Sequence, residues 1–376
     1  MKPPPEGDTP LGWDRHLAAK SYFSHWGIDV PRSIIDESVL RALAGDELST
    51  IQEVLGEATG LGWAREARNV LVVLRPEQDV NAYAWESRGN GRLVVVTTAL
   101  RRALIAVSGL LVAFIEELRR GSFADDSIMR SLPAPRSLED LEWAEIASRT
   151  IGKDLAQRGM FGVATSIWLE RARAVSAGAP LILGESGMPA AAESYVRAVY
   201  IGGMHFVLAH ELSHQFLGHT SSTAQPVAGF LAAINEWLAG SYLVDASSKD
   251  RVEMERSADL AAHAWIALSQ NRMDPTAGTL ASVGGAITAL SALSCFPKPL
   301  GATMPGTAIR EIDTIGQMTH PPIAERVSVA LGLSARSWDG RDGLRGPSLG
   351  RSLSFGLQLT AGAAFIEEAM RNIVNN

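Results

Sequence analysis

The feature that most constrains this chain is a pair of histidines four residues apart, His210 and His214, with Glu211 directly after the first. Residues four apart lie on one face of an α-helix, so a helix here would present both imidazoles to a single ion. Glu211 could then reach a water molecule bound to that ion. This His-Glu-x-x-His pattern is typical of sites in which zinc activates water and the glutamate takes its proton. The pattern therefore predicts a zinc-binding helix and a hydrolytic reaction.

A catalytic zinc site commonly has a third protein ligand, and there are two sequence routes to it. In the first route a third histidine follows in the pattern His-x-x-Gly-x-x-His, but Leu217 and Thr220 occupy the positions that need glycine and histidine. In the second route a glutamate on a later helix binds the ion. Glu255 has this form, because Asp259 follows it on the same helix face and could orient a histidine ring. Glu255 is the predicted ligand, and Glu253 remains open as an alternative.

The composition fits a globular chain and excludes several kinds of partner. With 376 residues and 46% hydrophobic content, the chain can bury a large core and is not of a disordered class. The net charge of −7 gives no basic field, so nucleic acid is not an expected partner. A single cysteine, Cys295, excludes an internal disulfide, and the first residues have no apolar core of a signal peptide. We therefore expect a cytoplasmic protein.

Two apolar stretches raise the question of a membrane span. Residues 103–115 are apolar but bracketed by charged residues, and this stretch is too short to cross a bilayer. Residues 275–297 carry no charge but are rich in Gly, Ser, Thr and Ala, which favours a buried and closely packed helix. Contact with a membrane is therefore not expected.

Helical periodicity dominates the chain. The longest helical pattern, residues 190–217, carries the histidine pair and stops at Gly218, while Gly202 inside it indicates either a weakened helix or a close packing contact. Two β-rich runs, residues 69–75 and 92–100, predict a buried strand and the second half of a hairpin. The sequence thus predicts an α+β fold that is mostly helical, with a small mixed sheet beside the zinc helix.

Four blocks of sequence carry a family resemblance. They are His-Glu-Leu-Ser-His-Gln-Phe-Leu-Gly-His at 210–219, Glu-Arg-Ser-Ala-Asp at 255–259, Thr-His-Pro-Pro-Ile-Ala-Glu-Arg at 319–326, and Asn-Ala-Tyr-Ala at 81–84 with Val-Val-Val-Thr-Thr-Ala-Leu at 94–100. Together they resemble the gluzincin metallopeptidases, and within these the M48-type peptidases. The resemblance implies a zincin-like fold that hydrolyses peptide bonds.

The resemblance also implies roles for individual residues. One Zn²⁺ per chain would be bound by the two histidines of the pair and by Glu255, with Glu211 as the general base. His320 would donate to the oxyanion of the tetrahedral intermediate and Arg326 would support it, although a histidine before two prolines can also be a simple turn residue. His219 is expected to be structural, at the end of the zinc helix.

The resemblance further implies how substrate would bind. The strand at residues 94–100 would be the edge of the sheet and would pair with an extended substrate, so the substrate-binding residues would be Val95, Val96, Thr97 and Thr98. A long segment, residues 101–200, separates this strand from the zinc helix and is expected to be a helical insertion.

The chain is expected to divide into five segments. Residues 1–66 form an N-terminal helical segment, 67–120 a hairpin and core helix, 121–189 a helical insertion that could cover the cleft, 190–333 the zinc-binding core, and 334–376 a C-terminal loop and helix. The expected function is that of a soluble zinc endopeptidase that cuts a protein or peptide substrate. Three alternatives stay open: a zinc-stabilised binding or regulatory module, a latent protease released by an activating partner, and a phage-exclusion-type protease that cuts one host protein.

Overall fold

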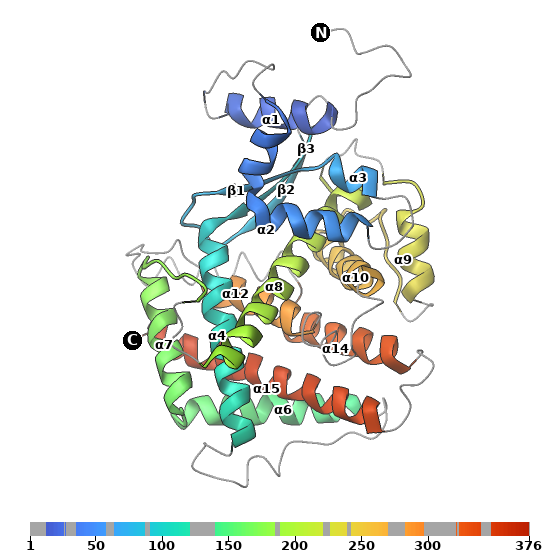
Figure 1. Cartoon of the computed structure of the whole chain (residues 1–376). Helices are drawn as coiled ribbons and strands as arrows, with labels where there is room; N and C mark the ends of the chain where they lie inside the picture. The colour runs from blue at the N-terminus through green and yellow to red at the C-terminus, as the bar shows by residue number, and fades with distance from the viewer. Residues whose placement is uncertain are drawn as a thin grey trace. The chain divides into compact units, whose positions relative to one another are not determined.

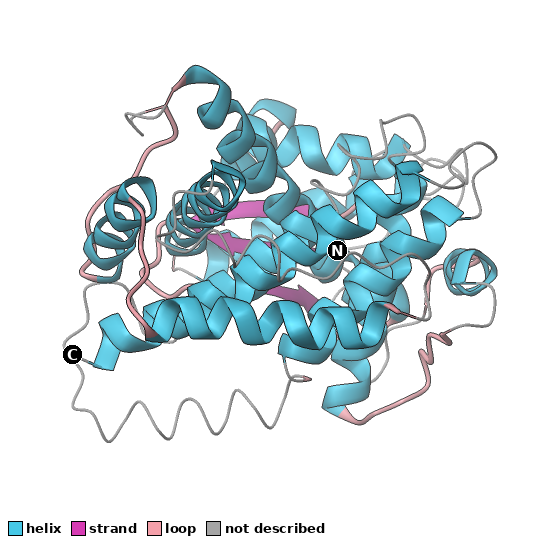
Figure 2. Cartoon of the chain, turned by 90° about the horizontal axis from the view of Figure 1, so that it is seen from below, coloured by secondary structure: helices cyan, strands magenta, loops and turns pink. Residues whose placement is uncertain are grey.

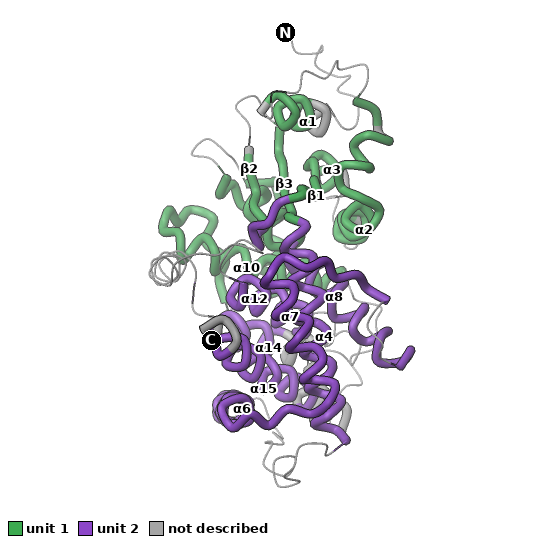
Figure 3. The backbone as a smooth tube through the Cα atoms, turned by 90° about the vertical axis from the view of Figure 1, so that its left-hand side faces the viewer, with its two compact units in different colours: residues 1–76, 82–97, 208–269 green, residues 77–81, 98–207, 270–376 purple. Residues whose placement is uncertain are grey.

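The chain folds into two compact units. The structure, a computed structural model, describes residues 13–25, 27, 35–57, 64–86, 91–120, 140–184, 189–220, 226–238, 242–269, 283–296, 321, 323–339 and 347–375 (Figure 1). Unit 1 comprises residues 1–76, 82–97 and 208–269, and unit 2 comprises residues 77–81, 98–207 and 270–376 (Figure 3). The fold is mostly helical with a small sheet, as predicted from the sequence.

The sheet in unit 1 is mixed. Its strands are β1 (Leu71–Arg75), β2 (Ala82–Glu86) and β3 (Arg92–Thr97), which Figure 2 shows among the helices. Their order is β1-β3-β2, with β1 parallel and β2 antiparallel to β3. The antiparallel pair is the predicted hairpin, and the parallel strand makes the sheet mixed, so both predictions are confirmed.

The prediction of the edge strand is wrong. β3 lies in the middle of the sheet and pairs along its length with β1 on one side and β2 on the other. The backbones of Val95, Val96 and Thr97 therefore have strand partners already, and Thr98 begins the helix α4 (Thr98–Arg120). The physical reason lies in the continuous buried run from residue 93 to 97, which suits a strand covered on both faces better than an edge. In the described sheet β2 is an outer strand.

Helices complete unit 1. α1 (Trp13–His25), α2 (Glu37–Glu57) and α3 (Ala64–Arg68) precede the sheet, and α9 (Phe230–Leu238) and α10 (Arg251–Ser269) follow the end of α8 (Ala190–Leu217). Residues from α1, from the start of α2 and the chain just before it, and from β1 and β3 form one core cluster: Ala18, Ala19, Ile35, Leu40, Leu71, Val73, Leu93 and Val95. α10 is joined to α2 by a hydrogen bond of 2.8 Å from Trp265 Nε1 to the Leu55 carbonyl.

Unit 2 is helical in its described part. It contains α4, α6 (Leu141–Gln157), α7 (Val163–Ser176), most of α8, α12 (Gly285–Cys295), α14 (Ile323–Asp339) and α15 (Pro347–Asn375). α4 has 23 residues and is long and apolar enough to cross a membrane, so the prediction that this stretch is too short is wrong. However, 83% of its most apolar window is buried inside the protein, which is typical of a core helix.

A glycine contact brings α12 against α8 within unit 2. A Cβ atom on Gly285 would lie 2.3 Å from the main-chain carbonyl carbon of Gly202, so the two backbones touch. This contact explains the glycine inside the long helical pattern as a packing position. The described residues of the uncharged stretch, 283–296, form a largely buried helix, as expected.

Candidate metal centre

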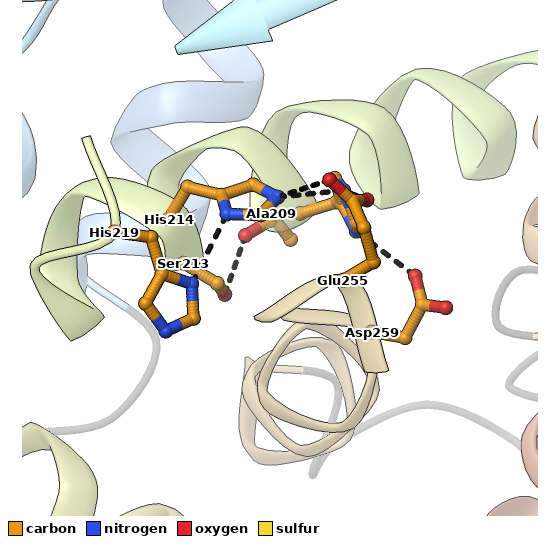
Figure 4. A network of polar contacts seen from close by, with 7 residues as sticks. Ala209, Ser213, His214, His219, Glu255 and Asp259 are labelled. Carbon is orange, nitrogen blue, oxygen red and sulfur yellow. Dashed lines mark hydrogen bonds and ion pairs between the residues drawn. The ribbon is translucent and has the colours of Figure 1, made fainter. Parts of the chain in front are cut away.

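Three side chains of unit 1 converge on one point. His210 and His214 lie one turn apart near the end of α8, and Glu255 lies on α10. Nε2 of His214 is 3.1 Å from Nε2 of His210 and 3.5 Å from Oε1 of Glu255, and Oε2 of Glu255 is 3.2 Å from Nε2 of His210. Figure 4 shows His214 and Glu255 pointing toward one another from the two helices. The structure thus brings together the three ligands predicted from the sequence.

The spacing of these donors fits a tetrahedral metal ion. Ligand atoms ~2 Å from a zinc ion at tetrahedral angles are separated by roughly 3.3 Å, close to the three distances above. Two neutral imidazoles and one carboxylate are also a donor set that zinc accepts in hydrolases. These three residues could therefore hold a metal ion.

Asp259 lies behind His210. Its Oδ1 is 2.9 Å from Nδ1 of His210, the ring nitrogen that faces away from the ligand cluster. Burial by itself lowers the pKa of His210, but the hydrogen bonds and charges of Asp259 and Glu255 outweigh burial and raise this pKa to about 10. In return, the two histidines hold the pKa of Glu255 far below its usual range despite its burial. Asp259 therefore has the geometry of a carboxylate that fixes the ring of a metal-binding histidine.

Glu211 is a buried carboxylate beside the ligands, with 8% of its surface exposed. Burial raises the pKa of Glu211 above its usual range, and the charges of His210 and His214 oppose this shift. The main-chain N–H of Ala84 on β2 donates a hydrogen bond to the Glu211 carboxylate. A carboxylate whose pKa is moved toward neutrality is suited to accept and return a proton.

The alternative ligand Glu253 lies outside the cluster. Its main-chain N–H donates to Oδ1 of Asp250 at 3.1 Å, which caps the start of α10. Its side chain is exposed and forms an ion pair with Arg256. The cluster of possible metal ligands found among the described residues contains Glu255 instead, which favours Glu255 over Glu253.

Two residues at the end of α8 were not assigned a part in the site from the sequence. Nδ1 of His219 is 3.1 Å from Nδ1 of His214, on the side of the ring away from the ligand nitrogen. Nε2 of Gln215 donates to the carbonyl of Trp85 on β2 at 2.9 Å and to that of Leu93 on β3 at 3.1 Å. The end of α8, which carries the two candidate histidine ligands, is thus hydrogen-bonded to both strands of the hairpin.

The remaining predicted residues are not placed in this site. His320 lies outside the described residues, so its role stays a prediction. Arg326 is buried in α14 of unit 2, and its supporting role also stays a prediction. His205 belongs to unit 2, and His263 is buried on α10.

Comparison with known proteins adds one finding about function. No curated protein and no solved structure matches the chain. Residues 184–338 match the model of a family described as Peptidase U49. This segment contains the three candidate ligands, Glu211 and Asp259, and the match supports a peptidase function for the chain.

Proposed function

We propose that the chain is a zinc-dependent endopeptidase of the gluzincin type. His210, His214 and Glu255 would hold one Zn²⁺, and Glu211 would be the general base. The observation that carries the proposal is the convergence of three donors at tetrahedral spacing beside a buried glutamate, inside the segment that resembles a peptidase family.

Each residue then has a defined part in peptide hydrolysis. A bound zinc ion would act as a Lewis acid that lowers the pKa of water to about 7. Glu211 accepts the proton of the attacking water and returns it to the leaving amine. The charge of Asp259 keeps Nδ1 of His210 protonated, so Nε2 keeps its lone pair for the ion. His320 as oxyanion donor and Arg326 as its support remain part of the proposal.

β2 is the strand that suits an extended substrate. It pairs with β3 on one side only in the described sheet, and its Ala84 N–H reaches the carboxylate of the proposed base. A peptide that added to β2 as a further strand would therefore pass close to Glu211. This assignment replaces the four residues at 95–98, whose strand has neighbours on both sides.

Zinc analysis and one substitution test the proposal. The purified protein should contain about one zinc per chain, and Glu211→Gln should keep the metal but lose hydrolysis. Glu253→Gln is the matched control, because this exposed glutamate lies on α10 and has no contact with the cluster. A zinc-free protein would refute the proposal, and full biological activity in Glu211→Gln would favour a zinc-stabilised binding module instead.

The substrate can be sought with the same pair of proteins. We propose a cytoplasmic location and a protein substrate, so new protein N-termini should appear in cells that express the wild type and not in cells that express Glu211→Gln. If the wild type binds zinc but cuts nothing, comparing the intact chain with a chain clipped within the predicted insertion, residues 101–200, tests whether it is latent, because clipping should then release activity.

A further inference from the structure

The sequence Gly218-His219 forms a specific ending for the metal-binding helix. Gly218 has a φ of 76°, which is the left-handed conformation that glycine adopts without strain. The N–H of His219 donates to the His214 carbonyl at 2.9 Å, and the N–H of Gly218 donates to the Gln215 carbonyl at 3.4 Å. This pair of hydrogen bonds is a Schellman motif. In this motif the second residue after the C-cap, here His219, contacts the residue three before the C-cap, here His214.

The motif therefore brings His219 onto His214. In Schellman motifs this contact is frequently between two apolar side chains. Here it joins two imidazoles whose ring centroids are 5.2 Å apart, with Nδ1 facing Nδ1 at 3.1 Å. Figure 4 shows His219 on the opposite side of His214 from Glu255.

The ligand geometry fixes the direction of this hydrogen bond. A histidine that binds an ion through Nε2 must carry its proton on Nδ1. Because Nε2 of His214 faces His210 and Glu255, its Nδ1–H donates and Nδ1 of His219 accepts. We propose that His219 is a positioning residue that holds the tautomer and ring plane of His214 in the zinc-bound enzyme. This inference rests on the proposed function.

Packing alone does not explain a histidine at this position. Nε2 of His219 is buried, and no hydrogen-bond partner lies within reach of it in the described part of the chain. A leucine would fill the same contact of the Schellman motif without a buried polar atom. The Nδ1 atoms of the two candidate histidine ligands thus have different partners: that of His210 faces the carboxylate of Asp259, and that of His214 faces the imidazole of His219.

Two substitutions of equal shape separate the hydrogen bond from the packing. In His219→Asn the Oδ1 atom can take the place of Nδ1 as acceptor, whereas His219→Leu has the same branched shape without an acceptor. Zinc affinity, measured by competition with a chromophoric chelator, should fall roughly 10- to 100-fold in His219→Leu and recover most of this loss in His219→Asn. The visible spectrum of the cobalt-substituted protein should shift in His219→Leu and return in His219→Asn.

The wild type provides a readout that needs no variant. In the zinc-loaded protein with ¹⁵N-labelled histidines, a coupling across the hydrogen bond should join Nδ1 of His214 to Nδ1 of His219. Unchanged zinc affinity in a folded His219→Leu, or a proton on Nε2 of zinc-bound His214, overturns the inference while the proposed function stands. A wild type that binds no zinc overturns both.

Discussion

The pH dependence expected of the proposed zinc site follows from the proton on His210. Without metal, the pKa of His210 is raised to about 10, so near neutral pH an arriving ion must displace the proton on Nε2, which faces Glu255, while the Nδ1 proton stays with Asp259. Competition with one such proton weakens the apparent affinity about tenfold for each pH unit below 10. Between pH 8.5 and 6.5 we therefore expect a loss of roughly 100-fold.

The protonation of His210 affects the stability of the metal-free protein with the opposite pH dependence. A histidine with a raised pKa contributes stability that is fully present below its unfolded value of about 6.5 and is lost as the pH rises toward 10. The free energy of unfolding of the metal-free protein should thus fall over this range. Zinc binding should strengthen over the same range.

Two measurements check this reasoning. Competition with a chelator of known proton affinity gives the dissociation constant at each pH, and calorimetry in buffers of different ionisation enthalpy gives the number of protons released. At pH 7.5 the wild type should release about one proton from His210 per zinc bound. In Asp259→Asn the main partner that raises the pKa of His210 loses its charge, so this pKa should fall. The rise of zinc affinity with pH should then level off at a lower pH than in the wild type.

One result would refute the argument. If the affinity of the wild type were independent of pH between 6.5 and 8.5, His210 would be neutral before the metal arrives. Asp259 and Glu255 would then not raise the pKa of His210 above neutral pH.

Three further predictions concern other parts of the chain. Gln215→Leu removes two hydrogen bonds to strand carbonyls at a cost of about 1–3 kcal/mol, and should lower kcat/KM on a cleaved substrate while one zinc per chain is retained. Gly285→Ala places a Cβ 2.3 Å from the backbone of Gly202 and should destabilise the fold by about 1–3 kcal/mol in urea unfolding, a loss that normal unfolding of the variant would contradict. Burial lowers the pKa of His205 to about 4, so stability should be lost as the pH falls from about 6.5 to 4, by at most about 3 kcal/mol, and His205→Met should abolish this dependence in unfolding curves measured across that range.

The ligand set could be predicted because its spacing is local. His210 and His214 share a helix face by their separation alone, and Glu255 with Asp259 repeats the same spacing on a second helix. Tertiary packing brings the two helices together. The candidate residues can nevertheless be recognised on each helix separately, because each helix carries two of them four residues apart. The amino-acid sequence alone therefore suffices to predict which three residues form the candidate cluster, with Glu253 as the one alternative left open.

The strand order could not be predicted in this way. Which of three strands lies in the middle depends on long-range pairing, and a resemblance suggested the wrong one. The buried run around Val95 is itself typical of a strand covered on both faces, so the pattern did contain the correction. The contact between His219 and His214 could also have been predicted from the sequence. Gly218 at the end of the helical pattern predicts a Schellman motif, and this motif places the next residue against His214.

The hydrogen bonds of Gln215 have a consequence for how the proposed zinc ion would be acquired. Because one carboxamide joins the end of α8 to β2 and β3, these elements should open together in hydrogen exchange rather than fray one by one. The main-chain amides of the hairpin and of residues 208–217 should then exchange at similar rates in chelator-treated protein. Such a cooperative unit would exist before the ion arrives, unlike a zinc finger, which folds only around its metal. Loading with zinc would be a binding step on a finished scaffold, and stripping it would leave a folded protein that can be recharged.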